Sequence, residues 1–273
     1  MKFADLHIHT IFSDGTYTPE GLVKDSLRSG LSTIAVVDHD TVMGIKPTIE
    51  IAKENGVEVL SGIELSAEED GLEVHILGYL IDYERQDLKE KLEFLRKNRI
   101  ERIYKIVDKL KGIGLSLKAE SVFDISQQGT VGRLHVARAM LKAGLVNSTG
   151  EAFQKYIGDR SPAYVCNFKF PTQEVIKLIK DIGGIPVLAH PYTLSKDELI
   201  LKLIDYGLMG LEVYYPEHSQ SMVNFYLGLT KKYNLLATGG SDCHGNAKPE
   251  AKIGCIKIPY ELVEKLKEAQ QIN

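Results

Sequence analysis

The chain has 273 residues, of which 44% are hydrophobic and 26% charged, a composition typical of globular proteins. This length allows one large domain, or a domain that carries an insertion, with a substantial core. The formal net charge of −4 argues against a broad electrostatic footprint for duplex nucleic acid, although a local basic cluster can still hold a small anionic substrate.

Three cysteines make an odd number without C-x-x-C spacing, so we expect no disulfide framework. The first residues lack a basic region followed by an apolar stretch, and no apolar run approaches membrane-spanning length. We therefore expect a soluble cytoplasmic protein without membrane contact. The oligomeric state stays open at this point.

Short β-branched segments alternate with helical patterns over the first eighty or so residues. Strands are predicted at 2–9, 33–38, 57–62 and 73–80, with a proline-initiated helix from residue 18 and a helix over 43–55. The alternation returns later, with strands at 185–190, 210–215, 235–240 and 253–258 and helices near 171–182, 196–206, 220–233 and 260–270. Such alternation predicts a parallel sheet covered by helices, here a closed or distorted barrel.

The middle of the chain interrupts this alternation, because residues 84–159 contain no convincing strand. Apolar residues at helical spacing predict one long amphipathic helix: Leu88, Leu92, Leu95, Ile103, Ile106, Val107 and Leu110. Shorter helices are predicted over 131–143 and 151–156. The prediction is an α/β barrel made of residues 1–83 and 160–273, with a small all-helical insertion over 84–159.

The motif D-L-H-I-H-T opens the first strand and places His7 and His9 two residues apart. In a strand both imidazoles then leave the same face, an arrangement that suits a divalent metal. Asp5 shares that face and is placed to orient one ring through its second nitrogen. Two histidines spaced in this way can equally be packed in the core or exposed, so the remaining histidines decide the interpretation.

The other candidate ligands mostly follow strand ends, where barrel enzymes assemble their sites. A single histidine there is more often a cap or a surface residue, but the repeated placement indicates a metal centre. Nine nitrogen and oxygen ligands exceed one zinc site and indicate two or three divalent ions, with Mn expected and Fe or Zn as alternatives. The candidates are His7, His9, Asp14, His39, Glu64, His75, His190, Asp242 and His244.

At these residues the sequence resembles the polymerase and histidinol phosphatase (PHP) family of phosphoesterases. The matching motifs are D-L-H-I-H-T with S-D-G (5–15), V-D-H-D (37–40), G-I-E-L-S (62–66), H-I-L-G-Y (75–79), A-H-P (189–191) and S-D-C-H (241–244). The resemblance implies a distorted seven-stranded (β/α) TIM-like barrel and a trinuclear metal centre.

Carried over by motif, the resemblance implies one metal on His7, His9 and Asp242. A second metal would be held by Asp14, His39 and His244, and a third by His75 and His190. Glu64 would bridge the first and third. Asp5, Asp38 and Asp40 are expected to orient ligands rather than to bind metal.

Clustered divalent ions activate a bound water and neutralise an in-line phosphoryl transition state, so no serine or cysteine nucleophile is required. The expected reaction is attack of metal-activated hydroxide on phosphorus. Asp14, His39, Glu64 and His244 are the expected catalytic residues, and Asp14, His39 and His244 are expected to contact substrate as well.

The insertion is expected to select the substrate. Arg96, Arg99 and Arg102 recur every three residues on one helix. For Arg96 and Arg102, a solvated face with ordinary salt bridges is slightly favoured. Arg99, Arg133 and His135 are the predicted substrate-binding residues, because a planar guanidinium binds phosphate oxygens bidentately.

A short basic helical insertion resembles the nucleoside 3′,5′-bisphosphate phosphatase branch, whose members remove the 3′-phosphate and in some cases trim 5′-phosphorylated RNA. A hydrolase of small phosphorylated nucleotides or short oligonucleotides is therefore expected. Alternatives are a histidinol-phosphate phosphatase, a metal-dependent amidohydrolase and a non-catalytic metal-binding module. Glu64 as a bridging acid and the final S-D-C-H favour phosphoesters over the amidohydrolase.

Overall fold

The structure is a computed structural model that describes residues 2–127, 129–166, 170–194 and 196–272. Within these residues, eight strands form one sheet in the order β7-β6-β5-β4-β3-β2-β1-β8. Their bounds are β1 (Phe3–Ile8), β2 (Thr33–Val36), β3 (Glu58–Glu69), β4 (Leu72–Tyr79), β5 (Ile185–Leu188), β6 (Gly210–Tyr214), β7 (Leu236–Gly239) and β8 (Ile258–Pro259).

The sheet closes into a barrel where the chain after β7 meets the end of β1. The N–H of His9 donates to the Cys243 carbonyl at 3.0 Å, and the N–H of Cys243 donates to the His7 carbonyl at 3.3 Å. Gly240 is required at this contact, because a Cβ there would lie 2.3 Å from the His7 nitrogen. This closure brings the first candidate ligands in the sequence, His7 and His9, next to the last, Asp242 and His244.

The strand predicted over 253–258 is largely a turn, and only Ile258 lies in β8. β8 pairs antiparallel with the start of β1, Phe3 opposite Pro259. Gly254, with φ of 71°, turns the chain within the predicted strand. The prediction was therefore wrong about the length of this element, because a left-handed glycine interrupts its apolar run.

The alternation of strands and helices predicted a parallel sheet, but part of the sheet is antiparallel. β4 runs antiparallel to both β3 and β5, and β3 and β4 form a hairpin. Asp70 and Gly71, with φ of 51° and 79°, provide the two left-handed residues that a tight two-residue hairpin turn requires. β3 consequently extends to Glu69, so Glu64 lies within a strand rather than after one.

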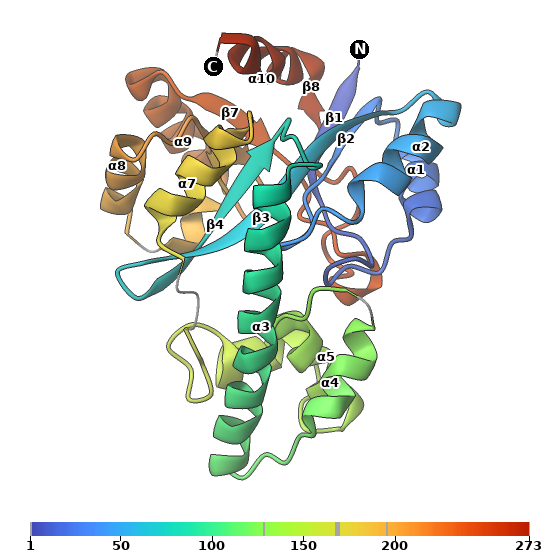
Figure 1. Ribbon diagram of the computed structural model, residues 1–273, viewed down its shortest axis with the longest axis vertical. Coiled ribbons are helices and arrows are strands. Elements are labelled where there is room, and N and C mark those ends of the chain that lie inside the picture. The colour runs from blue at the N-terminus through green and yellow to red at the C-terminus, as the bar shows by residue number, and fades with distance from the viewer. Residues whose placement is uncertain (1, 128, 167–169, 195, 273) are drawn as a thin grey trace.

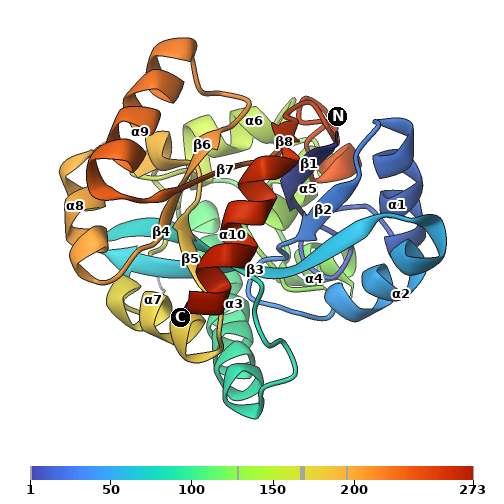
Figure 2. The same ribbon diagram turned by 90° about the horizontal axis from the view of Figure 1, so that it is seen from above.

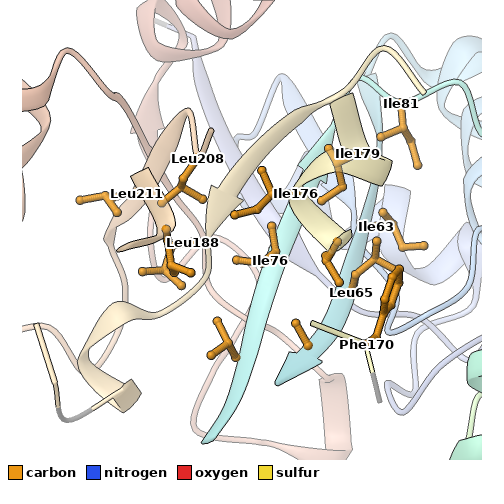
Figure 3. Close-up of a cluster of buried hydrophobic side chains, with 14 of the residues drawn as sticks. Ile63, Leu65, Ile76, Ile81, Phe170, Ile176, Ile179, Leu188, Leu208 and Leu211 are labelled. Atoms are coloured by element: carbon orange, nitrogen blue, oxygen red, sulfur yellow. The ribbon is translucent and has the colours of Figure 1, made fainter. Parts of the chain in front are cut away.

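Helices cover the outside of the barrel (Figures 1 and 2): α1 (Pro19–Arg28), α2 (Ile45–Asn55), α7 (Thr172–Asp181), α8 (Glu198–Asp205), α9 (Gln220–Tyr233) and α10 (Tyr260–Ile272). The Thr18 hydroxyl caps α1 by accepting the N–H of Gly21, as the Thr-Pro-Glu sequence predicts. Figure 3 shows one apolar cluster between α7 and the hairpin, where Ile176 and Ile179 face Ile63 and Ile76. None of the helices in the described ranges is long and apolar enough to cross a membrane.

The helical insertion lies at the end of the barrel opposite to both termini (Figure 1). It contains α3 (Gln86–Gly112), α4 (Ala119–Ser126), α5 (Arg133–Lys142), α6 (Thr149–Ala152) and one turn of π-helix, η1 (Phe153–Ile157). An α/β barrel with an all-helical insertion is therefore confirmed. The boundaries at 84 and 159 stay a prediction, because Leu88 in α3 packs in the barrel core whereas Ile103 and the later Val165 pack in the insertion core.

Candidate metal centre and substrate pocket

Glu64 lies at the centre of the candidate ligands, fully buried on β3. Its Oε1 atom is 2.9 Å from Nδ1 of His75 and 3.1 Å from Nε2 of His190. Its Oε2 atom lies 3.2 to 3.3 Å from a ring nitrogen of each of three histidines, His7, His9 and His39. One carboxylate thus faces two separate sets of imidazoles, one with each oxygen.

Two aspartates complete the cluster from loops at the same end of the barrel. Oδ1 of Asp242 is 3.2 Å from Nε2 of His9, and Oδ1 of Asp14 is 3.2 Å from Nε2 of His244. Three groups have potential ligand atoms within 4.8 Å of one another: His7, His9 and Asp242; His9, Asp14, His39 and His244; and His39, Glu64 and His75. The structure therefore brings all nine candidates together, with His190 joined through Glu64.

The donor atoms of this cluster fit divalent cations. Both ring nitrogens of His9, Oδ1 of Asp14, Nδ1 of His39 and Nδ1 of His75 are buried and, although polar atoms lie near several of them, make no hydrogen bond of normal geometry among the described residues. Buried polar atoms of this kind are costly unless a ligand satisfies them. Imidazole with carboxylate and no thiolate is the donor set of Mn, Fe and Zn.

The pKa shifts of the histidines also indicate that the cluster fits divalent cations. Burial disfavours protonation of His7, but the charges of Glu212 and Glu64 outweigh it and hold the His7 pKa well above its usual value. Burial likewise lowers the pKa of His9 and His75, but neighbouring carboxylates outweigh it and raise the pKa of His9 to about 9 and that of His75 to about 10. The carboxylates thus attract positive charge, which cations would supply by displacing these protons.

Backbone conformation at two candidate ligands is unusual. His190 and Asp242 have φ of 28° and 50°, in or near the left-handed region that L-residues rarely adopt. Residues held in this way cluster at functional sites, because the surrounding structure must stabilise the strained conformation.

Glu212 on β6 orients two candidate ligands, and the sequence analysis missed it. It is fully buried, with Oε1 2.8 Å from Nδ1 of His7, and its Oε2 accepts the backbone N–H of His190 at 2.8 Å. Glu73 on β4 does the same for His75, with Oε1 3.2 Å from Nε2. Each glutamate stands between two apolar residues of a strand. A charged residue at such a position was the sequence signal that could have identified them.

The three aspartates expected to orient ligands contact backbone N–H groups, hydroxyl groups or an arginine rather than histidine rings. Asp5 accepts the N–H groups of Ser241 and Gly254, both at 2.9 Å, and so secures the barrel closure. Asp38 accepts the Thr10 N–H at 2.7 Å and thereby positions the loop that leads to Asp14. Asp5 also accepts the backbone N–H of His7 at 3.4 Å. Only its expected contact with a histidine ring was wrong, because alternation along a strand gives the face of a side chain and not its partner.

A pocket of about 470 Å³ separates the cluster from the insertion. Six candidate ligands line this pocket: Asp14, His39, His75, His190, Asp242 and His244. The insertion contributes further lining residues: Arg99, Arg102, Gly132, Arg133, Leu134, Thr149, Gly150 and Phe153. The volume is in the range of small-molecule sites.

Arg99 reaches this pocket from α3 and is buried. Its Nε donates to Oδ2 of Asp40 at 2.6 Å and its Nη2 to Oγ of Ser66 at 2.8 Å. Asp40 therefore orients a pocket-lining arginine and not the ring of a candidate ligand. Gly132 packs against it, because a Cβ on Gly132 would lie 3.1 Å from Nη1 of Arg99.

Arg102 also lines the pocket, although a solvated face was slightly favoured for it. It is 3% exposed, and its Nη2 donates to Oε2 of Glu73 at 2.6 Å. Arg133 is half-buried and lies 3.0 Å from the same Glu73 oxygen. Arg96 does lie on the exposed face, where it pairs with Glu93. Helical spacing could not separate Arg96 from Arg102, because only the packing of α3 decides which face is covered.

His135 is not brought to the pocket surface. It is buried in α5, and its Nδ1 accepts the N–H of Gly132 at 3.1 Å. Burial lowers the His135 pKa to about 4, so the ring is neutral near pH 7. The structure places it behind the pocket wall, where it holds Gly132.

Lys248 and Tyr215 are pocket residues that the metal-ligand analysis did not include. Nζ of Lys248 lies 2.9 Å from Oδ2 of Asp242, and the Tyr215 hydroxyl donates to the same oxygen at 2.7 Å. They leave Oδ1 of Asp242 turned toward His9. Tyr192 and Phe153 add aromatic surface to the pocket.

The profile of the PHP domain family matches residues 5–176. The chain belongs to the PHP domain family. A 5′-3′ exoribonuclease of Haemophilus influenzae is 30% identical over 89% of this chain and 90% of its own length. A 3′,5′-nucleoside bisphosphate phosphatase of Chromobacterium violaceum is 28% identical over 93% of this chain and 91% of its own.

Two further comparisons broaden this picture of PHP proteins. A phosphoribosyl 1,2-cyclic phosphate 1,2-diphosphodiesterase of Eggerthella lenta is 28% identical over 93% of this chain and 98% of its own length. A structure assigned as a metal-dependent phosphoesterase of Bifidobacterium adolescentis aligns with a TM-score of 0.88 and 31% identity, covering 96% of this chain and 94% of that one. This PHP protein is accordingly a metal-dependent phosphoesterase, a hydrolase of phosphoester bonds.

Proposed function

We propose that this phosphoesterase removes the 3′-phosphate of nucleoside 3′,5′-bisphosphates and trims short 5′-phosphorylated RNA by the same reaction. One observation carries the proposal: a single pocket is lined both by six candidate metal ligands and by three arginines. Two groups of anion-binding residues in one pocket suit a substrate with two phosphates. The names of the exoribonuclease and bisphosphate phosphatase relatives support the same substrate class.

The proposed metal ligands divide into three sets around Glu64. His7, His9 and Asp242 form the first, Asp14, His39 and His244 the second, and His75 and His190 the third, with Mn proposed as the metal and Fe or Zn as alternatives. Support comes from the contacts of Glu64, whose Oε2 faces His9 of the first set and whose Oε1 faces His75 and His190 of the third. Divalent cations bound there supply Lewis acidity and a water of lowered pKa.

The protein's own groups then position the substrate. Asp14, His39 and His244 line the pocket and are the proposed contacts to the scissile phosphate. Arg99 and Arg133 are the proposed contacts to the second phosphate, and their ion pairs with Asp40 and Asp159 hold both guanidinium groups in place. His135 would act through Gly132 rather than by direct contact.

The reaction breaks the bond between phosphorus and the 3′-oxygen. Oxygen from water forms the new bond to phosphorus, and the 3′-oxygen leaves and takes up a proton. A bisphosphate then yields a nucleoside 5′-phosphate and inorganic phosphate. With RNA, the same cleavage releases the first nucleotide and leaves a 5′-phosphate on the shortened chain.

A substrate panel with Mn²⁺ tests the proposal. It compares a nucleoside 3′,5′-bisphosphate, the corresponding 3′-monophosphate, histidinol phosphate and a 5′-phosphorylated trinucleotide. We expect kcat/KM to be highest for the bisphosphate and at least tenfold lower for the 3′-monophosphate, which lacks the phosphate that the arginines would bind. Preferential hydrolysis of histidinol phosphate would refute the proposed substrate and establish the alternative phosphatase.

A further inference from the structure

A second groove, of about 780 Å³, adjoins the metal pocket between the insertion and the loop after β7. The two cavities share four lining residues, Thr149, Gly150, Ala247 and Glu250. The second groove is therefore continuous with the space in front of the candidate metal ligands. Its floor comes from α4, α5 and the segment around residue 147.

Two basic residues of α5 line this groove and not the metal pocket. Arg138 and Lys142 are one helical turn apart and share a face of α5. Across the described part of the chain, neither has a carboxylate within ion-pair distance. Glu250 is the acidic residue among those that line the groove.

Arg138 differs in this respect from the arginines that the sequence singled out. Arg99 and Arg133 are each held by an acidic side chain, whereas Arg138 is half-buried and has no carboxylate within ion-pair distance among the described residues. Burial lowers the Arg138 pKa, and the charge of Asp14 opposes that shift only in part. A partly desolvated guanidinium without a partner is expensive, so an anionic ligand is favoured at this position.

The same groove also offers apolar surface. Leu141 is 41% exposed and Ile125 is half-buried, and both line the groove beside the basic pair. Basic side chains next to an exposed apolar face suit a nucleotide unit, because phosphate and base are then both accommodated.

We propose that this groove binds the nucleotides that follow the scissile phosphate in an RNA substrate, with Arg138 and Lys142 on their phosphates. The inference rests on the proposed function. A bisphosphate ends at the scissile phosphate, but in RNA that phosphate carries the next nucleotide, which needs a path out of the metal pocket. The opening lined by Thr149, Gly150 and Ala247 provides this path.

The test compares two substrates in each variant with Mn²⁺: a nucleoside 3′,5′-bisphosphate and a 5′-phosphorylated trinucleotide. For Arg138→Gln we expect kcat/KM for the trinucleotide to fall about tenfold, mainly through KM, and the ratio of trinucleotide to bisphosphate kcat/KM to fall at least fivefold. Lys142→Gln, at a more exposed position, is expected to lower that ratio about threefold. Lys111→Gln, an exposed lysine at the end of α3, is the matched control and leaves the ratio unchanged.

A second readout distinguishes phosphate binding from a structural role. Removal of a phosphate-binding charge should make KM for the trinucleotide less dependent on salt. An unchanged ratio and salt dependence in the Arg138→Gln, Lys142→Gln double variant would overturn the groove assignment. Hydrolysis of the bisphosphate without any trinucleotide cleavage by the wild type would also overturn it and leave the phosphatase proposal standing, whereas inactivity toward both substrates would refute the two proposals together.

Discussion

Glu212→Gln tests whether a buried carboxylate behind the ligands controls metal affinity. Glu212 uses one oxygen for Nδ1 of His7 and the other for the backbone N–H of His190, both at 2.8 Å. Glutamine has the same shape but only one acceptor oxygen. The backbone N–H of His190 cannot change its role, so it keeps that oxygen, and the amide NH₂ then faces Nδ1 of His7.

This arrangement forces the wrong tautomer on His7. An NH₂ group opposite Nδ1 requires that nitrogen to accept, so the proton moves to Nε2. Nε2 is the atom that faces Glu64 and Asp242, at 3.3 and 3.4 Å, and its lone pair is what a metal would use. Loss of such an orienting partner typically costs 10- to 100-fold in metal affinity, or about 1.4 to 2.8 kcal/mol.

The assay is calorimetric titration of metal-free protein with Mn²⁺ at fixed pH, with circular dichroism to verify that the variant is folded. Glu261→Gln, an exposed substitution in the first turn of α10, is the matched control and should bind as the wild type does. Glu212→Gln protein that binds Mn²⁺ within twofold of wild type would refute the argument from tautomer control.

Further predictions concern the ligands, the arginines and pH. Asp242→Ala should remove metal and activity together, measured by metal analysis and phosphate release; full metal content in an inactive variant would contradict its role as a ligand. Arg133→Ala should raise KM for the bisphosphate about tenfold and change kcat less than threefold, with the exposed Arg96→Ala as control; unchanged kinetics would count against the insertion. Because the pKa values of His9 and His75 are raised to about 9 and about 10, metal must displace protons below those values. Affinity for Mn²⁺ should therefore rise from pH 6.5 to 8.5 with proton release on binding, and pH-independent affinity would refute this.

The candidate ligands could be found from sequence because each lies in a short, local signal. His39 and His190 follow apolar strands, and His7 and His9 show a two-residue period. Such patterns depend only on backbone geometry within a few residues, so they can be recognised without knowledge of the fold. His75 was also found from its position in a predicted strand. That strand runs antiparallel to its neighbours, but the Asp70-Gly71 turn brings His75 to the same end of the barrel as the other candidates.

The partners of those residues could not be found in this way. Glu212 and His7, for example, are separated by 205 positions. Arg96 and Arg102 share a spacing but not an environment, because packing of α3 buries one and exposes the other. Long-range contacts of this kind depend on which faces meet, and no local period encodes them.

The sequence by itself determined the barrel with a helical insertion and the nine candidate ligands, because these follow from periodicity and from motifs of a few residues, and the resemblance of those motifs to the PHP family indicated the phosphoesterase chemistry. Only the tertiary structure decided that β4 runs antiparallel, that Glu212 and Glu73 orient the histidines, and that Arg102 faces the pocket while His135 lies behind it. The physical reason is that side-chain identity specifies what a residue is able to bind, whereas the folded arrangement determines which partner lies within reach.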